Sequence, residues 1–159
     1  MNIRITNLHP IVVEHTPTCS TSATSAGDIL ADTEPVSGVW PYSISNPVNG
    51  VISSLALLDK NDHGANLDVV LLKSPASMGA ENAAVSIDDV SAEQIIGVIP
   101  VRSADYTDFV NSQVATPQFN PIPLKIDAGE RLNVAIIDRS GTNTFTASGL
   151  KLHFGIVQA

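Results

Sequence analysis

The amino-acid sequence predicts an all-β protein folded as an antiparallel β-sandwich, and three observations lead to this prediction. Apolar runs of strand length recur along the 159 residues and are bounded by polar, turn-forming clusters. Patterns with the 3.6-residue period of a helix are short. Ten Pro and ten Gly are spread along the chain and interrupt it at the short intervals that sandwich strands require. A chain of this length is most naturally one domain with a core of its own.

The clearest β signal is a pair of apolar segments in the first half of the chain. Residues 51–58 are largely apolar and end at the polar cluster 59–64, which is typical of a turn. Residues 66–73 alternate at first, are then fully apolar, and stop at Ser74-Pro75. Because consecutive strands usually lie together, the two segments are expected to form a hairpin or neighbouring strands.

The second half of the chain carries further strand patterns. The last one alternates well, with Leu150, Leu152, Phe154 and Ile156 on one face and polar or small residues on the other. The strands expected here are residues 94–101, 122–126, 132–138 and 150–157. The polar connection 139–149 has the composition of a loop.

Three other segments give weaker signals. Residues 36–45 carry Trp40 and Tyr42 around Pro41, which suits an edge strand or a kinked one. Residues 77–84 are expected to form one helical turn, and residues 91–93 to start another. Residues 1–25 are expected to be an N-terminal arm, or a first strand with a Ser/Thr-rich linker, and residues 26–159 a single sandwich domain.

Charge and cysteine content exclude several classes of protein. The net charge of −8 and the scattered Lys and Arg residues disfavour binding to nucleic acid or to an anionic membrane. The acidity is expected to keep the surface soluble, or alternatively to match a basic partner. With Cys19 as the only cysteine, no intramolecular disulfide can form. No stretch resembles a secretion signal or a membrane span, so we expect synthesis and folding in a cytoplasm.

Residue sets that carry catalysis or bind a metal are missing from the sequence. It has no Gly-x-Ser-x-Gly elbow, phosphate loop or dinucleotide motif, and its four histidines are far apart. Residues 59–64 resemble the start of a calcium loop, but His63 and Val70 occupy positions where that loop needs oxygen ligands. Asp88 and Asp89 are adjacent, so in an extended chain they would not converge on one substrate. We therefore expect no enzyme activity, no cofactor and no metal site.

Three segments together resemble a family of small β-sandwich proteins encoded near the head genes of tailed phages. The first is Ala26-Gly27-Asp28-Ile29-Leu30, preceded by Pro17 and a Ser/Thr-rich stretch. The second runs from residues 52–58 through 69–75 to Glu81-Asn82-Ala83-Ala84. The third is residues 127–137, followed by a polar loop and Leu150-Lys151-Leu152-His153. The aromatic residue that the family places before Ala-Gly-Asp is absent, and the stretch before Pro17 has no counterpart.

The resemblance implies a jelly-roll-like sandwich that decorates or cements a phage capsid. Such proteins lie on the outer face of the shell, often as trimers, and tie neighbouring major capsid subunits together. The implied partners are therefore the major capsid protein and further copies of this chain, and the implied location is the virion surface. The alternative is a receptor- or glycan-binding domain of a tail tip or fibre.

Candidate contact residues follow from both functions. The N-terminal segment is the candidate contact arm, and the loop 139–149 is the second contact region. Trp40 and Tyr42, or the same loop, would form a glycan site. The partner-contact candidates are His15, Thr16, Pro17, Thr18, Trp40, Tyr42, Arg139, Asn143 and Phe145.

Overall fold

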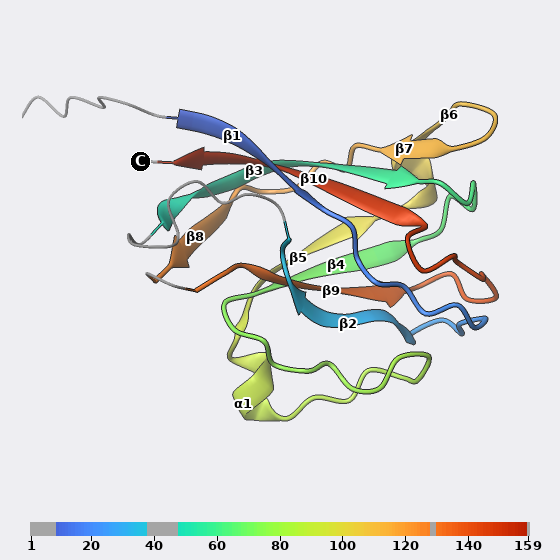
Figure 1. Ribbon diagram of the computed structural model, residues 1–159, viewed down its shortest axis with the longest axis horizontal. Helices are drawn as coiled ribbons and strands as arrows, with labels where there is room; N and C mark the ends of the chain where they lie inside the picture. Colours follow the sequence, from blue (N-terminus) through green and yellow to red (C-terminus); the bar gives the residue numbers. More distant parts are fainter. Residues whose placement is uncertain (1–8, 38–47, 128–129, 159) are drawn as a thin grey trace, which may run out of the picture.

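The computed structural model describes residues 9–37, 48–127 and 130–158, and these residues form two packed antiparallel sheets (Figure 1). The predicted all-β sandwich is therefore confirmed. One short helix, α1 (Asp89–Ala92), and one 3₁₀ turn, Ser103–Asp105, interrupt the strands. None of the helices in the described ranges is long and apolar enough to cross a membrane. The strands are β1 (His9–His15), β2 (Ile29–Pro35), β3 (Val48–Asp59), β4 (Leu67–Leu72), β5 (Ile95–Val101), β6 (Tyr106–Asp108), β7 (Gln113–Ala115), β8 (Ile122–Ile126), β9 (Asn133–Asp138) and β10 (Leu150–Gln158).

The strand pairing is that of a jelly roll. The first sheet contains the order β1-β10-β3-β8, and the second has the order β2-β9-β4-β5. Four antiparallel pairs are nested in the sequence: the outermost strands pair as β1–β10, and inside them follow β2–β9, β3–β8 and β4–β5. The chain thus behaves as one long folded ribbon wrapped around a core, which is the double Greek-key arrangement of jelly rolls. The β6–β7 hairpin stands outside this pattern and extends the first sheet beside the end of β3.

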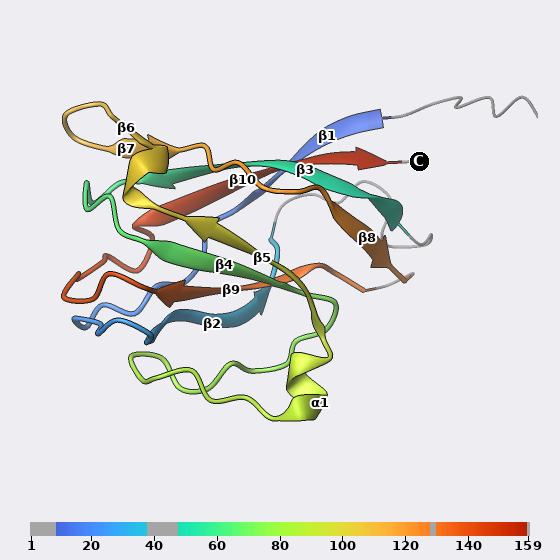
Figure 2. The ribbon, with the colours of Figure 1, turned by 180° about the vertical axis from the view of Figure 1, so that it is seen from behind.

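Burial explains why the strands differ in composition. In β10 buried and half-buried residues alternate, because one face meets the core and the other faces outward. In β4 and β9 every residue is buried. A second apolar cluster accounts for this, because Met78, Val85 and Ile87 from the segment before α1 pack against apolar residues of these strands. Figure 2 shows this segment running past β2 to α1.

The relation predicted between the two apolar segments of the first half is wrong. Residues 51–58 lie in β3 and residues 67–72 lie in β4, and these strands belong to different sheets. The turn between them carries the chain across the sandwich instead of reversing it within one sheet. The strands predicted at 94–101, 122–126, 132–138 and 150–157 correspond to β5, β8, β9 and β10.

Two alternatives were predicted for the N-terminal segment, an arm and a first strand. Among its described residues, His9–His15 form the strand β1. Residues 9–15 pair along β10 at the edge of the first sheet. Residues 16–25 are also attached to the body: the N–H groups of Cys19, Ser20 and Thr24 donate to the carbonyl oxygens of Ala147, Leu30 and Asn143. Of the strand predicted at 36–45, Val36 and Ser37 lie outside the strands, and residues 38–47 lie outside the described residues.

Candidate functional site

The N-terminal contact candidates divide into buried and exposed residues. His15 is only 3% exposed and Pro17 is buried, whereas Thr16 and Thr18 are exposed. Because a buried side chain offers little surface to a partner, the structure favours Thr16 and Thr18 over His15 and Pro17 as contact candidates. The alternation of side chains along an extended chain explains this difference, because every second residue from Val13 to Pro17 points toward the core.

His15 joins β1 of the first sheet to β2 of the second through hydrogen bonds. Its Nδ1 accepts from the Ser37 backbone N–H at 3.1 Å, so the ring proton is assigned to Nε2, which donates to Glu34 Oε1 at 3.0 Å. The same Glu34 oxygen accepts from the Thr18 N–H at 2.8 Å. Burial lowers the pKa of His15, and the nearby Glu34 carboxylate opposes this effect. The neutral ring is the form that fits this network.

Phe145 in the loop 139–149, one of the contact candidates, lies in the core of the chain. It is 2% exposed, belongs to the main core cluster and meets the His63 ring edge-on at 4.7 Å between centroids. Asn143 is half-buried, and its carbonyl oxygen accepts from the Thr24 N–H at 3.1 Å. The loop is therefore held down along part of its length.

Arg139 lies at the surface but is paired within the chain. Its Nε donates to Asp68 Oδ2 at 2.7 Å, and Arg102 Nη2 donates to the other oxygen of Asp68 at 3.0 Å. Asp68 is nearly buried, so the two guanidinium groups balance its charge at the end of the second sheet. The remaining candidates, Trp40 and Tyr42, lie outside the described residues.

Two fully buried carboxylates organise turns. Asp59 accepts from the backbone N–H groups of Asn61, His63 and Gly64 at 2.8–2.9 Å. Asp138 accepts from the N–H groups of Ser140 and Gly141 and from the Thr24 hydroxyl. Their oxygens are therefore occupied by donors of the chain itself, which agrees with a turn at residues 59–64.

The other groups singled out for their chemistry also have structural environments. Cys19 is buried, and this burial raises the pKa of its thiol to about 12, far from the thiolate form that reacts. Asp88 caps α1 by accepting from the Ser91 N–H at 2.7 Å. Within residues 9–37, 48–127 and 130–158, no three His, Cys, Asp or Glu side chains are arranged to hold a metal ion.

The β6–β7 hairpin ends in two exposed apolar residues that sequence reasoning did not select. Phe109 is 59% exposed and Val110 is 79% exposed; we call these two residues the hairpin tip. Val110 has a φ of +77°, a conformation that β-branched residues rarely adopt. Its N–H donates to Asp108 Oδ1 at 2.6 Å, and the Phe109 N–H donates to the Ser112 carbonyl oxygen. In the sequence, the signal for an exposed apolar turn was the pair Phe109-Val110 between two turn-forming residues, Asp108 and Asn111.

A groove of about 410 Å³ lies on the outer face of the first sheet, and we call it the outer groove. Small residues of neighbouring strands, Ser54, Ala56 and Gly155, form its floor. A Cβ atom at position 155 would collide with the Ser54 hydroxyl, so glycine keeps this floor low. Val12 of β1 and Phe119 of the segment after β7 also line the groove, and Val12 is 66% exposed.

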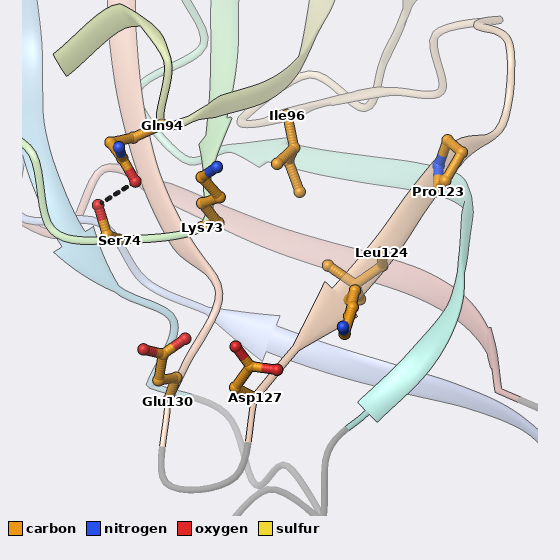
Figure 3. Close-up of a pocket in the computed structure, with 9 residues that line it drawn as sticks. Lys73, Ser74, Gln94, Ile96, Pro123, Leu124, Asp127 and Glu130 are labelled. Carbon is orange, nitrogen blue, oxygen red and sulfur yellow. Dashed lines mark hydrogen bonds between the residues drawn. The ribbon is translucent and has the colours of Figure 1, made fainter. Parts of the chain in front are cut away.

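A third feature is a polar hollow of about 520 Å³ between the ends of the two sheets (Figure 3). The close-up shows Lys73 and Gln94 on one side and Asp127 and Glu130 on the other. Ser74 donates to Gln94 Oε1 at 2.9 Å, which fixes that amide. Lys125 also lines the hollow, as do the apolar residues Ile96, Pro123 and Leu124, so a ligand would meet charged groups of both signs as well as apolar surface.

Comparisons of the sequence with protein families and with curated proteins found no relative: no protein-family model matches the chain, and no curated protein is significantly similar to it.

Proposed function

We propose that this protein is a structural component of a phage particle, a decoration or cement protein that binds the outer face of the head and stabilises contacts between major capsid subunits. The jelly-roll strand order carries the proposal, because this architecture is common among viral shell proteins. The phage-family resemblance of the sequence supports it independently. In a homo-oligomer, with a trimer the form we expect, several weak contacts act together and give firm attachment.

The roles of the polar residues also support a binding function over a catalytic one. His15, Asp59 and Asp138 are buried and satisfy hydrogen bonds of the fold, and Cys19 is held in its unreactive form. What the described surface offers instead is an apolar tip, a groove and a hollow, which are features that contact partners.

Counting copies of this chain in purified particles tests the proposal. Quantitative mass spectrometry of virions from its source should find hundreds of copies, in a simple ratio to the major shell protein. A handful of copies would place the protein in the tail or neck and favour receptor binding, and complete absence would contradict a virion role.

The second candidate is a glycan- or receptor-binding domain, and the polar hollow favours it. Lys73, Gln94 and Asp127 place donors and acceptors around one space, and jelly rolls include lectins. A glycan array should then show a signal that Gln94→Ala abolishes while the exposed Val90→Ser control retains it. An array without any signal would contradict this candidate.

A further inference from the structure

One insertion in the jelly roll carries the hairpin tip and lines one wall of the outer groove. Residues 102–121 connect β5 to β8 and include the β6–β7 hairpin, which lies outside the eight wrapped strands. The hairpin tip is at its turn, and residues 116–119 form one wall of the outer groove. Both ribbon views show the hairpin projecting beyond the end of β3, so the tip stands clear of its own body (Figures 1 and 2).

The hairpin tip is unfavourable for an isolated molecule. A left-handed backbone costs an L-residue roughly 1–2 kcal/mol, and a turn built from Gly or Asn would avoid that cost. Phe109 and Val110 also expose apolar surface that the fold does not need to expose. Strain and exposure at one point indicate a role in a contact, because neither stabilises the fold itself.

The outer groove has the properties of a site that receives such a tip. Its lining includes the apolar residues Val12 and Phe119, and its floor of small residues leaves room for an inserted side chain. Exposed sheet faces normally carry larger polar residues, so a floor of small residues beside the exposed Val12 indicates a covered surface.

Charge on the two surfaces is compatible with contact between copies. The tip is flanked by Asp105 and Asp108, and residues 103–124 contain no Lys or Arg. The groove is bordered by His153 and, next to it, by the ion pair of Lys151 with Glu14 at 2.9 Å. The charge of Lys151 is balanced by Glu14, so this edge of the groove carries no excess negative charge. In a chain of net charge −8, such an edge repels the acidic sides of the hairpin less than the acidic parts of the surface do.

We propose that the hairpin tip of one copy inserts into the outer groove of a second copy. The inference rests on the self-association included in the proposed function and names its surfaces. Because tip and groove are different parts of the chain, the contact is heterologous, and repetition of it closes a ring when the rotation allows. Phe109 and Val110 would be the buried anchors, and Asp108 would lie toward Lys151 and His153.

Two variants that damage one side each test the contact. Phe109→Ser combined with Val110→Asn removes the tip while keeping a residue suited to the turn, and Ser54→Glu fills the groove with a like charge. Val90→Ser is the matched control, because Val90 is 69% exposed on α1 and outside both surfaces. Sedimentation equilibrium should show wild type and control as oligomers. Each variant should dissociate at a concentration at least about tenfold higher, as expected when a buried anchor is lost. Unchanged thermal unfolding midpoints would show that the variants are folded.

Mixing the two variants distinguishes a heterologous contact from a symmetric one. The Ser54→Glu chain keeps its tip and the tip variant keeps its groove, so an equimolar mixture should form a heterodimer that neither forms alone. If both variants associate like wild type, or if the mixture stays monomeric, the tip-in-groove contact is overturned while self-association stands. If wild type is itself a monomer, self-association fails, and with it this inference. Loss of binding to purified shell protein by the tip variant would then identify the shell as the occupant.

Discussion

At the scale of single residues, polar groups that looked available for function are engaged in holding the fold together. Asp59 and Asp138 satisfy backbone donors of turns, and His15 bridges the two sheets. Composition alone does not reveal this, because the strand pairing that buries these groups, and some of their hydrogen-bond partners, come from segments distant in the chain. His15 and Ser37 are 22 positions apart, and Thr24 and Asp138 are 114 apart.

Replacing Phe145 with Ala tests whether the loop 139–149 is part of the core. Removing a fully buried Phe leaves a cavity, and the expected loss is about 3–5 kcal/mol of unfolding free energy. Asn143→Ala in the same loop is the control, with an expected change below about 1 kcal/mol because its side chain is half-buried. Urea denaturation of both variants measures the difference. If both variants lost little and equal unfolding free energy, the buried position of Phe145 would be contradicted.

The His15 network predicts a pH dependence of stability. The folded state lowers the pKa of His15 below its ordinary value of 6.5, so the unfolded chain takes up a proton first as the pH falls. Stability is therefore fully present above about pH 7 and decreases below pH 6.5. Urea midpoints between pH 7.5 and 5.5 should fall more for wild type than for His15→Gln, which cannot titrate. Parallel curves for the two proteins would contradict the assignment of a neutral, buried ring.

At the scale of elements, the sequence allowed strands with strong local patterns to be predicted, whereas strands without such patterns were missed. β10 and β4 were recognisable because alternation or continuous apolar character persists over their full length. β2 escaped detection because its polar residues have distant partners: Asp32 accepts from the Met78 N–H, and Glu34 binds His15. β6 and β7 are three residues each, too short to produce a periodic pattern.

The hairpin tip could be predicted from the sequence only in part. Its exposed apolar residues are visible in the sequence, but a Phe–Val pair could equally be core. What separates Phe109 from Phe145 is the position of each relative to the sheets. That position depends on pairing between strands far apart in the chain.

A matched pair of substitutions tests whether β1 is a strand of the sandwich or an arm. Val13 is 1% exposed and Val12 is 66% exposed, although they are neighbours. Val13→Thr buries a hydroxyl without a partner and should cost roughly 1–3 kcal/mol, whereas Val12→Thr should be nearly neutral. Chemical denaturation at a concentration where the protein is monomeric gives both values. Equal effects would mean that residues 9–15 do not pack as an alternating strand.

At the scale of the whole molecule, the jelly roll is defined by pairings that no local pattern specifies. His9 pairs with Gln158, so the first and last strands of the described chain lie side by side. The apolar runs of β3 and β4 indicate strands but not which sheet each joins. A strand-to-strand connection that crosses between sheets looks in sequence like one that turns within a sheet. For this reason the predicted β3–β4 neighbourhood was wrong although both strands were present.

The closed topology predicts that the chain tolerates circular permutation at one place and not at another. Because residues 9 and 158 are paired, they lie roughly 5 Å apart, and Ala159 fused to residues 1–8 is a linker long enough to join them. A permutant opened between Val110 and Asn111 interrupts only an exposed turn of the inserted hairpin and keeps all eight wrapped strands. It should unfold cooperatively with the far-UV circular dichroism spectrum of the wild type. A permutant opened between Val69 and Val70 cuts the fully buried strand β4, whose backbone bonds link β5 to β9, and should not fold. Cooperative folding of both permutants would contradict the central position of β4, and failure of both would contradict the pairing of β1 with β10.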